Sequence, residues 1–300
     1  MSGTVVTVGT FDGLHRGHRA VLEEIVRRAR ARNLASLLVT FDPHPLEVLN
    51  PAAAPRLLTL PDEKREILTQ TALDQVVLLP FTQELARLSA EEFVDRVLRE
   101  RHGMRELVVG YDHGFGRGRT GDVDAVREMG AREGFAVDVV DAVRDDGQPI
   151  SSSLIRTAVA HGDLAAAERW LGRPYSVLGV VERGVGRGRT IGVPTLNLAA
   201  PVPRKLLPPD GVYAVRVAHR AGRWGGMMNQ GPRPTFGVAA RGLEIHLFGF
   251  SGELYGETVT VEWVRRLRDV RTFASRDALV AQLARDRKAA EASLNLERAE

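Results

Sequence analysis

Short apolar runs alternate with amphipathic stretches along the first half of the chain. The apolar runs have the length and composition of buried strands, and they cover residues 4–9, 36–40, 75–79, 106–109 and 136–140. Between them, apolar residues recur at helical spacing near residues 19–32, 62–72, 89–102 and 122–133. Strands that alternate with helices predict a parallel sheet with right-handed crossovers, which is an α/β fold. In such sheets, ligands bind beyond the carboxyl ends of the strands.

The pattern changes in the second half, after a stretch from Ser151 to Trp170 that we interpret as helix. From Tyr175 onward, short β runs separated by Gly and Pro cover residues 176–182, 211–218, 223–229, 242–250 and 257–264. Helical periodicity returns only at about Arg276. The close spacing predicts a small antiparallel β-barrel closed by a C-terminal helix. We place the boundary near residues 172–176, which gives domains 1–173 and 174–300.

The segment from Gly9 to His18, GTFDGLHRGH, follows the first predicted strand and leads into the first predicted helix. The first backbone N–H groups of a helix lack partners, so a glycine-rich turn at this place makes an anion site. His15 and His18 are three residues apart, so both rings can share one face of the first helical turn. Two imidazoles beside free amides suit the phosphates of a nucleotide.

Three further segments follow predicted strands or begin a predicted helix. Residues 40–45, TFDPHP, form either a rigid turn or a ligand-binding loop at the edge of the sheet. Residues 110–122, GYDHGFGRGRTGD, are either a flexible loop or a place for a flat ring beside phosphates. Residues 150–156, ISSSLIR, supply hydroxyls and Arg156, which either cap the helix or hold a triphosphate.

Composition narrows the class of protein. The chain has 300 residues, 44% of them hydrophobic and 26% charged, so it can build two folded cores. It contains no cysteine, which excludes disulfides and thiol chemistry and fits a reducing cytoplasm. Residues 1–4 lack the basic and apolar regions of an export signal, and no apolar run reaches the ~20 residues of a membrane span. The net charge of +3 is spread along the chain, which argues against nucleic acid as a partner.

Together, these segments resemble the nucleotidylyltransferase superfamily, and specifically the FMN adenylyltransferase module of prokaryotic bifunctional riboflavin kinase/FAD synthetases. GTFDGLHRGH matches that family's GxFDGxHxGH signature, and TFDPHP, GYDHGFG and ISSSLIR match its other motifs in order. In the second half, residues 179–198 resemble the riboflavin kinase glycine-rich segment that leads into a PTAN motif. Residues 208–215, 229–236 and 243–256 continue the family pattern, so the resemblance covers essentially the whole chain.

The resemblance implies a Rossmann-like nucleotidylyltransferase domain followed by a riboflavin kinase barrel. It implies phosphorylation of riboflavin to FMN with ATP, then adenylylation of FMN to FAD with release of pyrophosphate. Mg²⁺ is the implied cofactor, and ATP, riboflavin, FMN and FAD are the implied small-molecule partners. The oligomeric state stays open.

The resemblance also implies the site residues. His15, His18 and Arg156 are the implied catalytic groups of adenylyl transfer, and Glu244 is the implied catalytic base of the kinase. The ATP site of adenylyl transfer would use Gly9, Thr10, Phe11, Asp12, His15, His18, Ser151, Ser152 and Arg156. The flavin beside it would meet Asp42, Pro43, His44, Asp112 and Phe115. The kinase would hold its nucleotide with Gly184, Gly186, Gly188, Gly192, Thr195 and Asn197, of which Thr195 and Asn197 would bind the metal.

Several points stay open at this stage. Asp12 either orients the turn, holds a metal-bound water, or caps the following backbone. The chain departs from the commonest family residues at Ser153, Leu196, His113, Gly114, Gln230 and Gly249. We expect Leu196 to add bulk near the metal, and the residues at 113 and 114 to alter flavin stacking. The alternatives are a kinase fused to a degenerate first domain, a basic nucleic-acid-binding protein, and a nucleotidylyltransferase with another acceptor.

Overall fold

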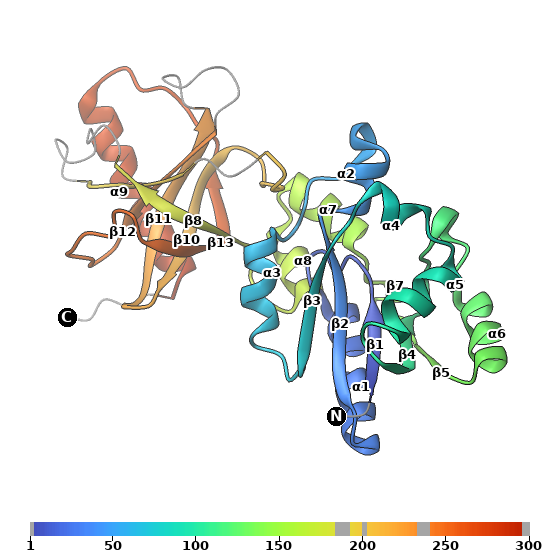
Figure 1. Cartoon of the computed structure of the whole chain (residues 1–300). Coiled ribbons are helices and arrows are strands. Elements are labelled where there is room, and N and C mark those ends of the chain that lie inside the picture. The colour runs from blue at the N-terminus through green and yellow to red at the C-terminus, as the bar shows by residue number, and fades with distance from the viewer. Residues whose placement is uncertain (1–2, 184–192, 200–202, 233–240, 296–300) are drawn as a thin grey trace. The chain divides into compact units, whose positions relative to one another are not determined.

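The computed structural model describes residues 3–183, 193–199, 203–232 and 241–295 (Figure 1). By its internal contacts the chain divides into two compact units, Met1–Leu154 and Ile155–Glu300. Each unit is described by itself. This division falls inside the helix α7 (Ser152–His161), whereas the boundary expected near residues 172–176 follows the next helix, α8 (Leu164–Leu171), and stays a prediction.

The first unit is built on a parallel sheet with the strand order β3-β2-β1-β4-β5. All neighbouring pairs in it are parallel, which confirms the expected α/β fold. The strands are β1 (Thr4–Val8), β2 (Ala35–Asp42), β3 (Gln75–Pro80), β4 (Met104–Gly110) and β5 (Ala136–Val140). A short antiparallel hairpin, β6 (Arg144–Asp145) and β7 (Gln148–Pro149), follows the sheet.

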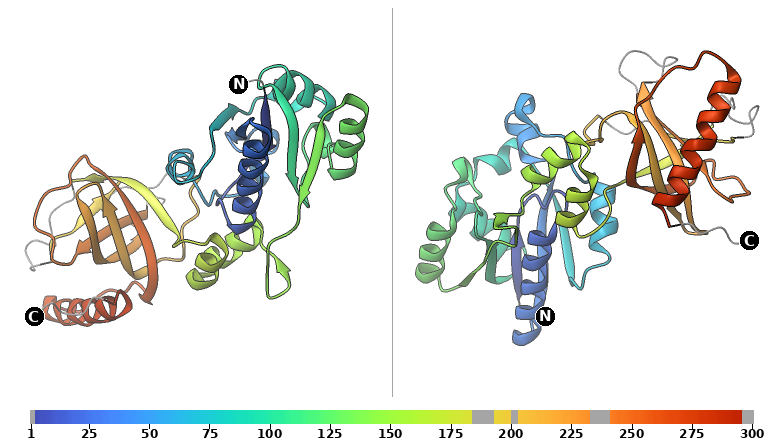
Figure 2. Two further views of the ribbon diagram at one scale, coloured as in Figure 1. Left: turned by 90° about the horizontal axis from the view of Figure 1, so that it is seen from below. Right: turned by 180° about the vertical axis from the view of Figure 1, so that it is seen from behind.

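Helices cover both faces of this sheet, as the views in Figures 1 and 2 show. On one face, Val5 of β1 packs with Leu22 and Ile25 of α1 (Arg16–Arg32). On the other face, Val6 packs with Val94, because successive strand residues point to opposite sides. The remaining helices of the unit are α2 (Pro45–Leu49), α3 (Pro61–Leu68), α4 (Gln83–Arg87), α5 (Ala90–Phe93) and α6 (Val123–Glu133).

The helix expected over residues 89–102 changes type along its length. After α5 it continues as a π-helical segment, Val94–Arg99. Short 3₁₀ turns occur at Pro51–Ala53 and Arg117–Arg119. Sequence periodicity cannot separate these helix types over one or two turns.

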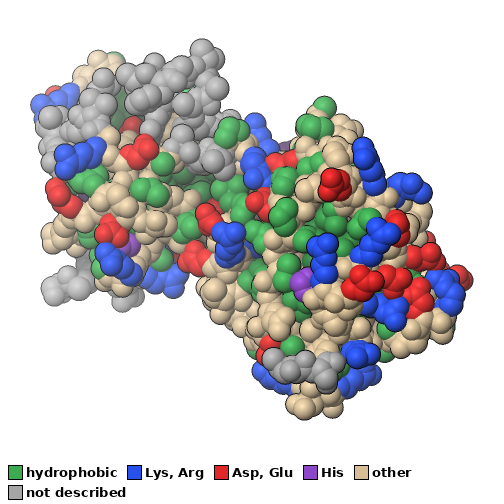
Figure 3. All heavy atoms as spheres, viewed as in Figure 1, with side chains coloured by type: hydrophobic (Ala, Val, Ile, Leu, Met, Phe, Trp, Pro, Cys, Tyr) green, Lys and Arg blue, Asp and Glu red, His purple; other side chains and the backbone are tan. Residues whose placement is uncertain are grey.

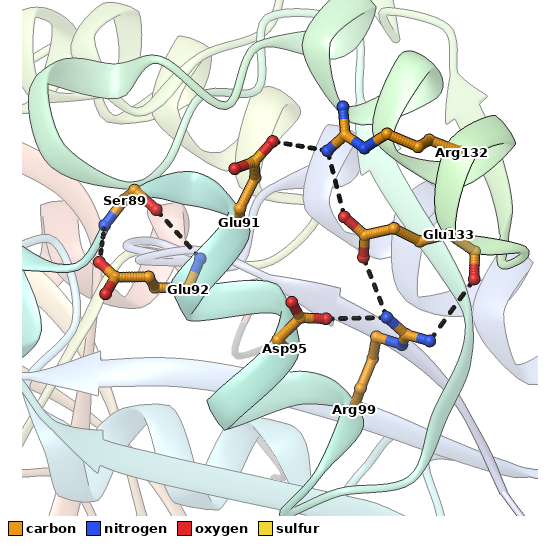
Figure 4. Close-up of polar contacts among 7 residues, drawn as sticks. All are labelled: Ser89, Glu91, Glu92, Asp95, Arg99, Arg132 and Glu133. Atoms are coloured by element: carbon orange, nitrogen blue, oxygen red, sulfur yellow. Dashed lines mark hydrogen bonds and ion pairs between the residues drawn. The ribbon is translucent and has the colours of Figure 1, made fainter.

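Ion pairs join α5 and the π-helical segment to α6 (Figure 4). Arg132 contacts Glu91 at 2.5 Å, and Arg99 contacts Glu133 at 2.9 Å and Asp95 at 2.8 Å. Ser89 begins α5 with a reciprocal cap, since its hydroxyl accepts from the backbone N–H of Glu92 while the Glu92 carboxylate accepts from that of Ser89. Exposed pairs of this kind contribute little to stability individually.

The stretch from Ser151 to Trp170 is two helices, so the expectation of one helix was wrong. α7 (Ser152–His161) ends before Gly162, which has a φ of +80°. Asp163 then caps α8 (Leu164–Leu171) by accepting from the N–H of Ala166 at 3.0 Å. A glycine followed by an aspartate is a helix stop and a helix start, and this signal was in the sequence.

The second unit contains a closed barrel with the strand order β10-β11-β12-β9-β8-β13, which confirms the expected antiparallel barrel. Its strands are β8 (Ser176–Glu182), β9 (Leu196–Leu198), β10 (Gly211–His219), β11 (Gly222–Pro232), β12 (Arg241–Leu247) and β13 (Thr258–Arg268). β9 was not predicted, because three residues are too short for a periodic signal.

The C-terminal helix α9 (Arg276–Ser293) packs on the outer face of this barrel, as expected. Ala290 and Leu294 contact a cluster that includes Ala214 and Met227. Asp286, which is 3% exposed, pairs with Arg268 of β13 at 2.6 Å.

None of the helices among the described residues is both long and apolar enough to cross a membrane.

Two candidate active sites

The Gly9–His18 turn lies at the switch point of the parallel sheet. The chain runs from β1 outward to β2 and β3, then returns to β4 on the other side of β1. The loops that follow β1 and β4 therefore diverge at the carboxyl edge of the sheet, where doubly wound folds bind their ligands. The turn connects β1, whose five residues are all buried, to the N-terminus of α1.

The backbone of this turn is strained. Phe11 has a φ of +46° and Leu14 a φ of +42°, which are left-handed backbone values that residues other than glycine rarely adopt. Gly13 between them has a φ of +83°. Phe11 is 5% and Leu14 is 1% exposed, so burial of both side chains offsets part of the strain. Strained backbone of this kind is concentrated at ligand-binding turns.

Asp12 holds the turn against the segment that precedes α3. Its carboxylate is 2% exposed and accepts from the N–H of Leu58 at 3.0 Å, and from the N–H and hydroxyl of Thr59 at 2.9 and 3.1 Å. The hydroxyl of Thr59 also accepts from the N–H of Gly13 at 3.0 Å. Of the three roles left open for Asp12, the geometry favours orientation of the turn.

His15 and His18 lie together at the start of α1. The Nδ1 atom of His15 caps the helix by accepting from the N–H of His18 at 3.3 Å. This hydrogen bond assigns the ring proton of neutral His15 to Nε2. The two rings stack with centroids 3.6 Å apart, and the ring of Phe11 lies 4.7 Å from that of His18. The structure thus brings together the two histidines of the HxGH sequence.

The start of α7 joins the same turn. The hydroxyl of Ser152 donates to the carbonyl of Asp12 at 2.9 Å, and the hydroxyl of Ser151 caps α7 by accepting from the N–H of Leu154 at 3.2 Å. Arg156 follows Ser152 by four residues, so the two share a face of α7.

The TFDPHP segment ends β2, beside β1. Asp42, Pro43 and His44 are partly exposed. His44 caps α2, since its Nδ1 accepts from the N–H of Leu46 at 3.2 Å, and Glu47 accepts from the N–H of His44 at 2.8 Å.

The loop after β4 is attached to the start of α5, the helix that Figure 4 shows tied to α6. Phe115 is 9% exposed and packs with Phe93 in the core, so its ring supports the loop. Gly121 approaches Ala90 so closely that a Cβ there would lie 2.9 Å from the Ala90 side chain. Asp112 is exposed, and desolvation, together with the neighbouring Asp112, raises the pKa of Tyr111.

Sequence reasoning missed two residues that contact the turn, Thr59, described above, and Lys64. Lys64 of α3 donates from Nζ to the carbonyl of Thr10 at 2.6 Å and to the hydroxyl of Thr40 at 3.2 Å. The Thr40 hydroxyl also donates to the Thr10 carbonyl, at 3.0 Å. A usable signal existed: lysine occurs only at positions 64, 205 and 288 in a chain whose other basic residues are arginine.

In the second unit, strand register lines up the polar residues of the kinase motifs. Glu244 of β12 lies opposite Asn197 of β9 on one side and Asn229 of β11 on the other. Residues that are directly opposite in a ladder share a face, so the three side chains form one row. Glu244 and Asn229 are exposed, while Asn197 is 9% exposed. Asn229 is a residue that the sequence had not assigned to the site.

The segment before β9 is linked to this row. The Nδ1 atom of His246 lies 2.8 Å from the carbonyl of Pro194, next to the partly exposed Thr195. Leu196 lies between Thr195 and Asn197, and strand alternation points it to the opposite face from Asn197. The expectation that Leu196 adds bulk near the metal is therefore not supported by the strand geometry. Gly184, Gly186, Gly188 and Gly192 lie outside the described residues.

Two departures from the family pattern have structural explanations. Gln230 is fully buried, donates to the carbonyl of Pro208 at 2.6 Å and accepts from the indole of Trp263 at 3.1 Å. Gly249 has a φ of +64°, a conformation that favours glycine. Both residues serve the barrel itself.

An anion-binding turn at the switch point of a parallel sheet, followed by a barrel with a carboxylate–amide row, defines a two-domain nucleotide-dependent transferase. Comparisons specify this class. Residues 1–154 match the family model of FAD synthetase, and residues 171–294 match that of riboflavin kinase. The chain belongs to the family of bifunctional riboflavin kinase/FMN adenylyltransferases.

Similar proteins cover the chain almost completely. The bifunctional riboflavin kinase/FMN adenylyltransferase of Pseudomonas fluorescens is 41% identical over 97% of this chain and 93% of its own length. The protein of the same name from Escherichia coli K12 is 39% identical over 95% and 90%, respectively. A crystal structure from Streptococcus pneumoniae, of a protein named as a macrolide-efflux protein, superposes with a TM-score of 0.86. It is 33% identical and covers 97% of this chain and 95% of its own.

Proposed function

We propose that this chain makes both flavin cofactors, with one reaction in each domain. It phosphorylates riboflavin to FMN with ATP, and it adenylylates FMN to FAD with ATP and release of pyrophosphate. The observation that carries the residue assignment is the strained turn with its paired histidines at the switch point.

Adenylyl transfer needs positioning more than proton transfer. The attacking group is the phosphate of FMN, and the second pKa of a phosphate monoester is ~6, so it is already ionised near neutral pH. The site must bring two anions into line and stabilise the charge on the departing pyrophosphate. We assign these tasks to the amides of residues 10 and 11, the Nε2–H of His15, and His18; the amide of Gly9 donates to the carbonyl of Val39 at 3.1 Å and holds the start of the turn to β2. Ser151, Ser152 and Arg156 on α7 complete this set.

The flavin of FMN would lie between the loops that follow β2 and β4. Asp42, Pro43, His44 and Asp112 are exposed or partly exposed there. We assign Phe115 to the support of the loop, since it is buried in the core.

Riboflavin kinase chemistry starts from a hydroxyl, whose proton must leave as the oxygen attacks the γ-phosphate of ATP. We assign the role of proton acceptor to Glu244. Its exposure on the barrel's outer face makes the carboxylate accessible to a substrate hydroxyl. Asn197 and Asn229 flank it in the ladder and can orient the substrate oxygens around it.

Mg²⁺ is the proposed metal, and the donors near the kinase row fit it. Thr195 and Asn197 offer neutral oxygen atoms, which Mg²⁺ accepts when nucleotide phosphates and water supply its other ligands. The described residues contain no group of three or more His, Cys, Asp or Glu that could hold a metal. A site of hydroxyl, amide and phosphate oxygens needs no such group. When bound, the ion neutralises phosphate charge.

The environment of these reactions is also a proposal. A cysteine-free chain suits a reducing cytoplasm. On the face seen in Figure 3, basic and acidic side chains are interspersed over the described surface. This supports small-molecule partners over nucleic acid.

Chromatography of flavins tests the function directly. Purified protein is incubated with riboflavin, ATP and Mg²⁺, and a second sample starts from FMN. We expect FMN and FAD in the first sample and FAD with pyrophosphate in the second. FMN alone would indicate a degenerate first domain, and no flavin product at all would overturn the assignment.

A further inference from the structure

The Gly9–Leu14 turn does not hold its conformation alone. Phe11 and Leu14 occupy left-handed backbone regions that are unfavourable for residues with a Cβ atom. Such a conformation persists only where surrounding contacts fix it. Ser152 of α7 and Thr40 of β2 each donate to one carbonyl of the turn. Most of the other side-chain contacts come from the Leu57–Lys64 segment, which none of the nucleotide or flavin motifs includes.

The first contact is made through Thr59. Its hydroxyl accepts from the N–H of Gly13 at 3.0 Å and donates to the Asp12 carboxylate at 3.1 Å. Thr59 is 4% exposed and Asp12 is 2% exposed, so water does not compete for these bonds. In such surroundings, loss of one partner leaves the other without a replacement. Thr59 thus determines where the middle of the turn lies.

The second contact is made through Lys64. Lys64 is 7% exposed, and its ammonium donates to the carbonyl of Thr10 at 2.6 Å, at the start of the turn. Thr40 of β2 receives a second bond from the same nitrogen at 3.2 Å, so the turn is tied to the neighbouring strand. A compact ammonium can reach two oxygens in this space, whereas a guanidinium is a broad planar fork. This distinction is consistent with a lysine in a chain that otherwise uses arginine.

The Leu57–Lys64 segment is itself rigid. Leu57 and Leu58 are 5% and 1% exposed. Glu63 accepts from the N–H of Leu60 at 2.8 Å, which closes the first turn of α3. Leu68, at the end of α3, packs in the same core cluster as α1. Both ends of the phosphate turn are therefore fixed to one buried framework.

We propose that Thr59 and Lys64 are positioning residues of adenylyl transfer, which hold the Gly9–Leu14 turn in its phosphate-binding conformation. This inference rests on the proposed function of the turn as the ATP-phosphate site. Lys64 also places a buried positive charge beneath the turn, where low solvent access strengthens its attraction for the phosphates.

The test compares Thr59→Val with Thr59→Ser in the full chain. Valine keeps the shape and removes the hydroxyl, whereas serine keeps the hydroxyl. Because small displacements of reacting groups cost up to ~10²-fold in rate, we expect Thr59→Val to lower kcat for FAD formation about 10- to 100-fold. The KM for FMN should change less, since other loops hold the flavin. Thr59→Ser should restore kcat to near the parent value.

Further measurements separate positioning from misfolding. Circular dichroism and thermal melting of the same preparation report whether the half that carries Thr59 is folded, and riboflavin kinase activity, which reports the other half, should equal that of the parent. Hydrogen exchange of the Gly9–Leu14 amides should be faster in Thr59→Val, because the turn opens more readily. Parent-like adenylyl transfer in a folded Thr59→Val chain would overturn the proposal.

Lys64→Met provides an independent test, with Lys288→Met on the exposed side of α9 as its matched control. We expect Lys64→Met to lose FAD synthesis and Lys288→Met to retain both activities. If Thr59→Val does not fold, a parent-like kcat in Lys64→Met overturns the proposal by itself. His18→Ala is assayed in parallel: if it also leaves FAD synthesis intact, the phosphate site is misassigned. If His18→Ala loses FAD synthesis while the Thr59 and Lys64 variants keep parent-like FAD synthesis, the phosphate site is correctly assigned and the proposed positioning role is wrong.

Discussion

The two candidate sites are built in opposite ways. The adenylyl-transfer turn is buried and strained, and side chains from β2, α3 and α7 fix its backbone. In the kinase row, Glu244 and Asn229 are exposed while Asn197 is 9% exposed, and strand register places the three side chains side by side. Adenylyl transfer begins with an ionised nucleophile and requires a binding site of fixed geometry. Riboflavin phosphorylation begins with a protonated hydroxyl and requires an accessible carboxylate.

This comparison predicts which changes each site tolerates. Activity at the adenylyl-transfer turn should be sensitive to substitution of residues that do not contact the substrate, because these residues set the geometry of the turn. A row on a barrel face should depend mainly on the chemistry of its own side chains. Each prediction below uses one activity of the chain as the control for the other.

The largest effect should come from Glu244→Gln. Glutamine keeps the size of the side chain but cannot accept the riboflavin proton. Removal of a general base commonly costs ~10²–10⁴-fold in rate, so FMN formation should nearly stop. FMN supplied from outside should still become FAD at the parent rate. Normal riboflavin phosphorylation by this variant would show that Glu244 is not the catalytic base. The contrast between the two sites would then lose its evidence on the kinase side.

His18→Ala should produce the reciprocal result. The variant loses a group that we expect to stabilise the transition state of adenylyl transfer, a loss that typically costs ~10²–10³-fold. FAD formation from FMN should fall by this amount, while riboflavin phosphorylation continues. Chromatography of both reactions from one preparation measures the two rates. Equal loss of both activities would show that the sites are not independent.

Thr195→Val should have a smaller effect that is confined to the kinase. Valine keeps the shape and removes the hydroxyl that we assign to Mg²⁺. Perturbation of the groups around a bound metal typically costs ~10–100-fold in affinity or activity. The magnesium dependence of FMN formation should shift to higher concentration, and calorimetry should show weaker binding of ADP with Mg²⁺. If the magnesium titrations of the variant and the parent superimpose, Thr195 does not bind the metal and has a structural role.

Much of the fold could be predicted because each element carries a local signal. α1 is 17 residues long with apolar residues at helical spacing, and β1 is a continuous apolar run before it, so both positions followed from the sequence pattern. β9 has three residues and the β6–β7 hairpin has two residues per strand, which is below the length at which periodicity is visible. Gly162 and Asp163 are a helix stop and a helix start, so they signal the break between α7 and α8. The apolar spacing continues across both helices, and for this reason we interpreted the stretch as one helix.

The candidate site could be predicted where its residues stand in recognisable motifs, including Ser152, which contacts Asp12 across 140 positions. His15 and His18 stand in one motif, and the structure stacks their rings. Thr59 and Lys64 are separated from the turn by 46 and 54 positions in their hydrogen bonds. Contacts at such separations follow from the packing of α3 beside α1 and leave no periodic signal. Strand register placed Asn229 beside Glu244 in the same way.

The smallest predicted effect concerns acid stability of the adenylyl-transfer half. Hydrogen bonding from Arg27, with a contribution from Arg28, lowers the pKa of Glu24 on α1 to about 2. Arg28 also pairs with the buried Glu106 of β4, so the cluster fastens α1 to the sheet. A carboxylate whose folded pKa is depressed stabilises the protein above its unfolded pKa of ~4.3, and that stabilisation is lost as pH falls toward 2.

Glu24→Gln should therefore destabilise this half at pH 7 by no more than ~1 kcal/mol. The difference from the parent should shrink as pH falls from about 4.5 to 2. Thermal inactivation of FAD synthesis, measured at several pH values, reports this half, and FMN synthesis reports the other. The matched control is Glu257→Gln in the barrel, where a hydrogen bond from His219 lowers the pKa of a carboxylate that is 39% exposed. If the stability difference between Glu24→Gln and the parent does not change with pH, the ion cluster around Glu24 does not contribute to the acid stability of α1 and the turn before it.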